Sequence, residues 1–96
     1  MDLERDIEKE LVRGVRLAGG VAFKFVSPGN DGVPDRIVVR PGGKITFVEL
    51  KTVRGRLTKR QVSQIRRLTA LGLDVRVLYG MEDVREFLKE IGGDET

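Results

Sequence analysis

The fold is decided by residues 35–51, which read DRIVVRPGGKITFVELK. Both halves of this segment are rich in β-branched and apolar residues, whereas Pro41-Gly42-Gly43 in the middle are typical turn residues. We therefore predict an antiparallel β-hairpin with one strand at 35–40 and the other at 44–51.

The length of the turn sets the register of this hairpin. A three-residue loop places Arg40 opposite Lys44, and counting outward then places Asp35 opposite Glu49 on one face, with Cβ atoms about 5 Å apart. Lys51, two residues after Glu49, projects from the same face. A two-residue loop would shift the register by one residue and send the two carboxylates to opposite faces.

The remaining elements follow from hydrophobic spacing and from the positions of glycine and proline. Helices are predicted at 2–18, 58–71 and 81–91, and further strands at 21–26 and 74–79. The third strand, the second helix and the fourth strand form a βαβ unit, whose two strands are expected to be parallel. The predicted fold is therefore α/β, with a mixed sheet flanked by helices in the order αβββαβα.

Composition limits the chemistry that this chain can carry out. Its 96 residues suit one domain, 1–96, whose last residues, 92–96, we expect to fray. Histidine and cysteine are absent, which excludes catalytic triads, thiolate zinc sites and imidazole-bound metals. Magnesium and manganese remain, because carboxylates can hold them alone. No membrane span or signal peptide is recognisable, so we expect a soluble cytoplasmic protein.

The two opposed acids of the hairpin have two interpretations. One is a surface salt-bridge cluster, which is common on solvated β-ribbons. The other is a cation site, because two close carboxylates repel each other unless a cation lies between them. Val38-Val39 and Phe47-Val48 are apolar at successive positions, which predicts a sheet buried on both faces along its middle and favours the second interpretation. The Gly/Pro-rich loop before Asp35 favours it too, because long loops are usually functional.

A basic run follows the hairpin, and it is expected to bind phosphates. Lys59 and Arg60 lie at the start of the second helix, where the helix dipole prefers acids, so both cations are placed against local electrostatics. Arg54 and Arg56 precede them, and Ser27 in the Gly/Pro-rich loop is a further candidate phosphate contact. The alternative is that these residues are ordinary surface cations.

The acids and the lysine of the hairpin, with the residues around them, resemble the pattern of a known family. Pro34-Asp35 followed by Glu49-Leu50-Lys51 resembles the PD-(D/E)xK pattern of the restriction-endonuclease-like superfamily. The fuller pattern resembles the virus-type replication-repair nuclease (VRR-NUC) domain, and it comprises residues 32–36, Gly43, residues 47–51, residues 55–58 and Gln61. The resemblance extends from the first helix to about Glu90.

The resemblance implies a metal-dependent DNA endonuclease with a restriction-endonuclease-like fold. Asp35, Glu49 and the Leu50 carbonyl would hold Mg²⁺ or Mn²⁺, and Lys51 would orient the attacking water or stabilise the transition-state charge.

The family also has an acidic residue in the first helix. Glu8 borders the apolar stripe and is the first choice, as a metal ligand either directly or through a water. Glu4 is the second choice, and Glu10 is expected to point toward solvent. The alternative is that all three are solvated helix acids.

Gln61 has two interpretations of its own. Thr58-x-x-Gln61 is a capping box, in which the glutamine accepts from the Thr58 amide. The resemblance instead implies that Gln61 lies near the catalytic metal.

Nothing in the sequence is typical of base reading, so recognition through phosphates is favoured. We expect a bacterial or phage-encoded homodimer that cuts branched DNA such as Holliday junctions, in replication or repair, because two symmetric cuts require two sites. The alternatives are a non-catalytic DNA-binding module and a nuclease subunit that depends on a partner protein.

Overall fold

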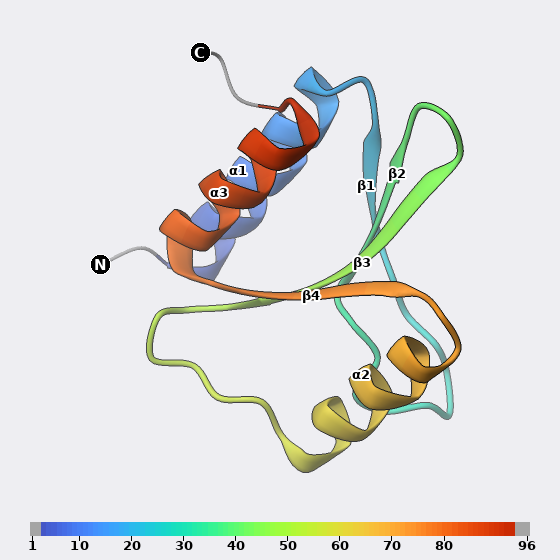
Figure 1. Ribbon diagram of the computed structural model, residues 1–96. Coiled ribbons are helices and arrows are strands. Elements are labelled where there is room, and N and C mark those ends of the chain that lie inside the picture. Colours follow the sequence, from blue (N-terminus) through green and yellow to red (C-terminus); the bar gives the residue numbers. More distant parts are fainter. Residues whose placement is uncertain (1–2, 94–96) are drawn as a thin grey trace.

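The computed structural model describes residues 3–93, and these form a four-stranded sheet with three helices (Figure 1). Along the chain the elements are α1 (Glu4–Leu17), β1 (Val21–Lys24), β2 (Arg36–Arg40), β3 (Lys44–Lys51), α2 (Lys59–Ala70), β4 (Asp74–Tyr79) and α3 (Gly80–Ile91). The predicted order αβββαβα is confirmed, and β3 and β4 have the predicted bounds. The other elements begin or end within one or two residues of their predicted limits, as helix ends commonly do.

The hairpin register is confirmed. Arg40 pairs with Lys44 and Arg36 pairs with Val48, as a three-residue loop requires. Gly42 and Gly43 make this turn possible, since their φ angles of 84° and 70° lie in the left-handed region. The sheet order is β1-β2-β3-β4, with antiparallel β1–β2 and β2–β3 pairs and the expected parallel β3–β4 pair.

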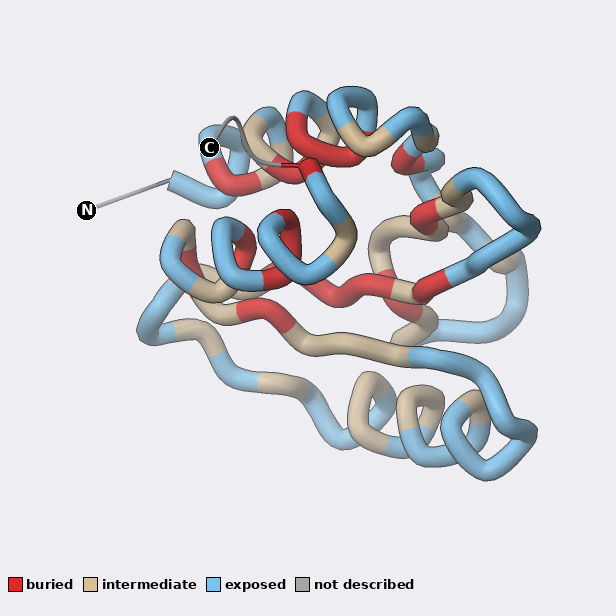
Figure 2. The backbone as a smooth tube through the Cα atoms, turned by 45° about the horizontal axis from the view of Figure 1, so that its top comes forward, coloured by how far each residue is buried: buried red, intermediate tan, exposed pale blue. Residues whose placement is uncertain are grey.

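One face of the sheet carries the hydrophobic core. Helices α1 and α3 lie side by side over this face (Figures 1 and 2). The core residues are apolar side chains from α1, the sheet and α3: Ile7, Leu11, Val15, Ala22, Val38, Val48, Leu50, Leu78, Val84, Phe87 and Leu88. Burial of this many large side chains, each contributing about 1.5–3 kcal/mol, fixes where the two helices sit on the sheet.

The other face, which α2 covers, is less buried than we predicted. Val39 and Phe47 on this face are only half-buried, and within α2 no residue is fully buried. Val21, Phe23 and Ile45 leave about half of their surface exposed. The expectation of burial on both faces along the middle of the sheet is therefore met only on the α1 and α3 face, because α2 packs mainly against β4 and leaves Val39 and Phe47 half-buried.

The long loop between β1 and β2 packs on the start of α2. Arg60 of α2 forms an ion pair of 2.6 Å with Asp31 of the loop. Gly32 has a φ of 90°, and a Cβ atom there would lie 2.6 Å from the backbone carbon of Arg60. No other residue type fits at this position, so Gly32 allows the loop to lie directly against the helix backbone.

The described chain ends in a packed turn. Gly92 ends α3 with a φ of 83°, and the Gly93 amide donates to the Leu88 carbonyl at 2.7 Å. Residues 94–96 of the expected tail lie outside the described residues. Within 3–93, none of the helices is long and apolar enough to cross a membrane.

Candidate active site

Asp35, directly before β2, and Glu49 of β3 lie at the end of the hairpin away from its turn. Since Arg36 pairs with Val48, the preceding residue Asp35 lies opposite Glu49. The position of Asp35 is fixed by two backbone contacts. Its carbonyl accepts the Phe25 amide at 2.8 Å, and its Oδ2 accepts the Leu50 amide at 3.3 Å. The juxtaposition that we predicted from the turn length is thus present.

Glu49 is a buried acid in a central strand. Its side chain is 2% exposed, and burial together with the neighbouring Asp35 carboxyl raises its pKa to about 7. Lys51 acts in the opposite direction and lowers the pKa. Two acids held this close, one of them buried, destabilise the doubly charged form and create a strong preference for a cation or a proton.

One oxygen of Glu49 has no partner within the chain that the structure describes. Oε2 accepts from Gln61 and lies 3.6 Å from the Lys51 ammonium, whereas Oε1 is buried and unbonded. The other buried polar side chain of the core, Thr46, is fully satisfied, because its hydroxyl accepts from Arg40 and donates to Asp74. An orphaned carboxylate oxygen is costly unless a further group binds it.

This arrangement fits a hard divalent metal ion. The donors would be the carboxylates of Asp35 and Glu49 and, as the family resemblance implies, the Leu50 carbonyl, all oxygen atoms of the kind that Mg²⁺ and Mn²⁺ prefer. Within residues 3–93, no group of three or more acidic, histidine or cysteine side chains is placed to hold a metal. Among the described residues, the acids at the end of the hairpin are Asp35 and Glu49.

Lys51 lies at the last position of β3, beside Glu49. Its side chain is 18% exposed, so the ammonium group is near the surface while its stem is covered. Gly55 lies against that stem: a Cβ atom there would lie 3.1 Å from the Lys51 Cβ. The loop after β3 therefore limits the directions that Lys51 can take.

Gln61 forms the predicted capping box and at the same time contacts Glu49. Its Oε1 accepts the Thr58 amide at 2.9 Å, while the Thr58 hydroxyl accepts the Gln61 amide, which completes the capping box. Its Nε2 donates to Glu49 Oε2 at 3.1 Å. A carboxamide can do this because it has an acceptor and a donor at opposite corners.

Glu8 is held away from Glu49. It projects over the α1 side of the sheet and accepts a hydrogen bond of 2.8 Å from Arg36. It shares a cleft with Glu4 and Asp35, so it borders the site from the far side of β2. Glu10 does not point toward solvent as expected. It pairs with Arg13, and this hydrogen bond is the main cause that lowers its pKa.

The basic run is divided by the fold. Arg54 and Arg56 line a hollow in the loop after β3, and Lys59 is exposed at the start of α2. Arg60 is instead paired with Asp31, so part of its charge is already used to hold the long loop. Ser27 accepts a hydrogen bond from the Asn30 side chain at 2.9 Å, which stabilises the turn of that loop.

Sequence reasoning missed the role of Arg36. This residue joins Glu8 of α1 to the Ala22 carbonyl of β1 and so connects the first helix to the strands beside the site. The sequence around Arg36 gives no sign of this pairing, because Glu8 is 28 positions away in the chain.

The fold and the order of Asp35, Glu49 and Lys51 along the chain match the PD-(D/E)xK class of proteins, and the comparisons with known proteins show the family within it. The VRR-NUC domain family model matches residues 16–82, and the chain belongs to this family. A protein of Acyrthosiphon pisum secondary endosymbiont phage 1, named "Putative nuclease p44", is 55% identical over 75 residues, which cover 78% of this chain and 81% of that protein.

Two solved structures share the fold. One, named "VRR_NUC domain", superposes with a TM-score of 0.84 at 26% identity and covers 90% of this chain and 94% of that one. The other, named "VRR_NUC domain protein", has a TM-score of 0.66 at 20% identity and covers 95% and 89%.

Proposed function

We propose that this protein is an Mg²⁺- or Mn²⁺-dependent endodeoxyribonuclease that cuts branched DNA. Membership of the VRR-NUC family and the phage relative support a nuclease. The observation that carries the metal dependence is the buried, unbonded Oε1 of Glu49 opposite Asp35.

The metal would be held by Asp35, Glu49 and the Leu50 carbonyl. When bound, such an ion polarises a phosphodiester oxygen and lowers the pKa of a coordinated water. Gln61 and Lys51 both engage Oε2 of Glu49 and thereby leave Oε1 available for the metal.

Lys51 acts on the reacting phosphate in this proposal. Its ammonium group lies near the surface next to Glu49, where it can orient the attacking water or stabilise the charge that develops on the phosphate oxygens. Glu8 lines the same cleft as Asp35 and is held in place by Arg36. In this proposal Glu8 positions a water in that cleft.

Recognition of branched DNA would depend on phosphates and on symmetry. Arg54, Arg56 and Lys59 are exposed beside the site and suit backbone contacts that read no sequence. A homodimer would supply two sites for two cuts, and the partly uncovered face around Val21 and Phe23 is an apolar surface that a second copy can bury. We place the protein in the cytoplasm of a bacterial host, in phage replication or repair.

The decisive experiment is cleavage of a panel of four-way, flap, nicked and linear DNAs with Mn²⁺ and with EDTA. We expect cutting only with the metal and fastest on the four-way junction, and no cutting by Asp35→Asn. If DNA is bound but never cut, the chain is a binding module or requires a partner protein, which size-exclusion chromatography with candidate partners would reveal.

A further inference from the structure

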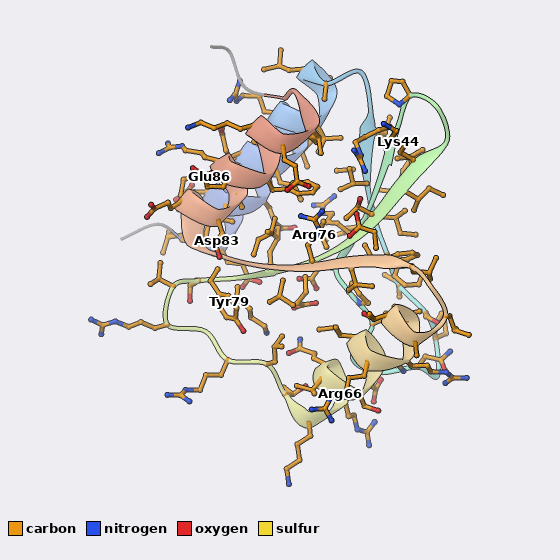
Figure 3. The ribbon with its side chains drawn as sticks, in the orientation of Figure 1. Lys44, Arg66, Arg76, Tyr79, Asp83 and Glu86 are labelled. Atoms are coloured by element: carbon orange, nitrogen blue, oxygen red, sulfur yellow. The ribbon has the colours of Figure 1, made fainter. Side chains whose placement is uncertain are left out.

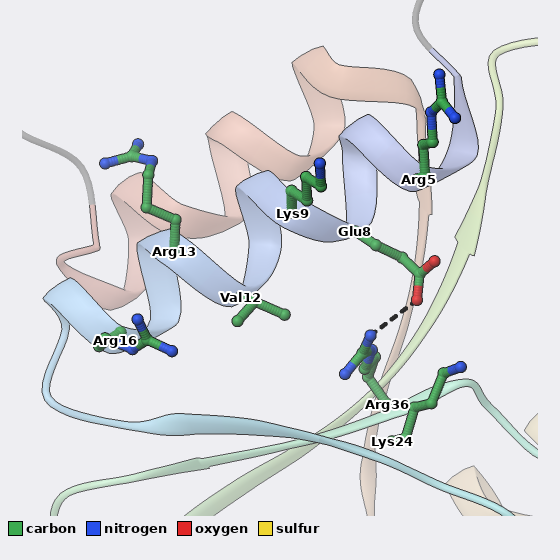
Figure 4. A pocket seen from close by; sticks show the side chains of 8 residues that line it. All are labelled: Arg5, Glu8, Lys9, Val12, Arg13, Arg16, Lys24 and Arg36. Atoms are coloured by element: carbon green, nitrogen blue, oxygen red, sulfur yellow. Dashed lines mark hydrogen bonds and ion pairs between the residues drawn. The ribbon is translucent and has the colours of Figure 1, made fainter.

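A basic groove runs along α1 on the side of the sheet opposite to α2. Figure 4 shows Arg5, Lys9, Arg13 and Arg16 on successive turns of the helix, above Lys24 and Arg36 on the neighbouring strands. Six cations line this groove together with one carboxylate, that of Glu8. The whole chain has a net charge of only +3, so positive charge is concentrated here.

Most of this charge is not neutralised by the protein. Glu8 is engaged by Arg36, and Arg13 is paired with Glu10. Within residues 3–93, no acidic side chain forms an ion pair with the remaining four cations of the groove, Arg5, Lys9, Arg16 and Lys24. Arg5, Lys9 and Arg13 follow one another at i, i+4 spacing, and like charges at this spacing disfavour an isolated helix unless an anion lies against them.

The groove leads to the candidate active site. Its residues Glu8 and Lys24 also line the cleft that contains Asp35. Arg16 lies at the other end, about 16 Å from Arg5 along the helix axis at 1.5 Å per residue. That length corresponds to about five phosphates along one DNA strand.

We propose that this groove binds the phosphate backbone of a DNA duplex arm and guides it to Asp35 and Glu49. The inference rests on the proposed nuclease function and adds a second contact surface to it. Arg56 and Lys59 lie on the α2 side of the sheet and the groove lies on the α1 side, so DNA would be held on both sides of the cutting point (Figures 1 and 4). The lining favours phosphates over a lipid surface, because Val12 is its one apolar side chain and is half-buried.

The test compares two double variants with the same loss of charge. Lys9→Ala with Arg16→Ala removes two exposed groove cations, and alanine favours the helix. Lys44→Ala with Lys89→Ala is the control. Lys44 lies at the hairpin tip, at the end of the strands opposite to Tyr79 and the site (Figure 3), and Lys89 lies on α3 beside acidic residues. Binding of a labelled duplex is measured in EDTA across a salt series, with thermal unfolding as a check on folding.

We expect the groove variant to flatten the plot of log affinity against log salt by about 0.9 per lost contact, or roughly two units in total. The control should keep the wild-type slope. In the cleavage assay the loss should appear as a raised KM. An unchanged slope, or equal losses in both variants, would overturn the proposal.

Two further outcomes separate this inference from the nuclease assignment. If wild type binds DNA with the groove-dependent slope but never cuts, the groove stands and the nuclease proposal fails. If wild type cuts and the groove variant matches it in slope, the groove proposal fails alone. Poly-glutamate tests the alternative that the groove binds an acidic polypeptide. If the groove variant loses binding of poly-glutamate but keeps the binding of DNA, the groove belongs to an acidic polypeptide and the proposal is overturned.

Discussion

Gln61 connects the N-terminus of α2 to the buried acid of β3, because one carboxamide accepts from the Thr58 amide and donates to Glu49. The helix cap and the candidate active site therefore share a side chain. Local helix stability and the orientation of Glu49 are coupled, and two variants can separate them.

Gln61→Ala should weaken both functions, whereas Thr58→Ala should weaken only the cap. Loss of the Thr58 hydroxyl costs about 1 kcal/mol of stability, and the Gln61–Glu49 hydrogen bond can persist. We expect a fall in melting temperature for both variants, but a loss of DNA cleavage only for Gln61→Ala. Equal cleavage by both would contradict a role for Gln61 at the site.

Lys51→Ala should abolish cleavage while leaving folding and DNA binding nearly unchanged. The side chain ends near the surface and packs against Gly55, so its removal leaves the core intact. Unfolding, DNA binding in EDTA and nicking with Mn²⁺ are measured on the same sample. Arg66→Ala, which removes an exposed cation of α2, is the control. Wild-type nicking by pure Lys51→Ala would reject the assignment.

Asp35→Asn should also stop cleavage, but for a different reason. It keeps the shape of the side chain and removes the charge that Asp35 presents to Glu49 and to any bound phosphate. We therefore expect retained or slightly tighter DNA binding. Isothermal titration with Mn²⁺ should show weaker metal binding than in wild type. Unaltered Mn²⁺ affinity would place the metal elsewhere.

The geometry at Asp35 and Glu49 could be predicted from sequence because it depends on one local feature. Pro41-Gly42-Gly43 fixes the turn, and the turn fixes every pair along the hairpin. The link between Glu8 and Arg36 could not be predicted, because it depends on how α1 packs across the sheet. The partial cover by α2 was also missed, since successive apolar residues in β2 and β3 indicate which side chains can be buried and not what buries them.

The stability of the metal-free protein should fall as pH rises from about 4.5 toward 7. Burial raises the pKa of Glu49 to about 7 in the folded chain, against 4.5 for an ordinary glutamate. Between these values the folded state holds a proton that the unfolded state has lost. The stabilisation is complete below pH 4.5 and is lost by about pH 7. Urea unfolding in EDTA across this range measures it.

Glu49→Gln tests that assignment, since an uncharged amide has no such titration. The variant should show a flatter pH profile and should gain on wild type as pH rises. Glu86→Gln, an exposed acid of α3, is the control and should keep the wild-type profile. Parallel profiles for wild type and Glu49→Gln would show that another group is responsible.

The basic run after β3 should bind DNA phosphates without reading sequence. Arg56→Ala with Lys59→Ala removes two exposed cations and spares Arg60, which holds the long loop through Asp31. Affinity for all DNA substrates should fall to a similar degree, and the salt slope should flatten by about 0.9 per lost contact. Folding stability should hold or rise by a few tenths of a kcal/mol, because Lys59 opposes the dipole at the start of α2. Binding across a salt series and thermal unfolding check both parts, with Lys44→Ala plus Lys89→Ala as the charge-matched control. A selective loss for one DNA structure would instead indicate that these residues read shape, and an unchanged slope would mean that they face only solvent.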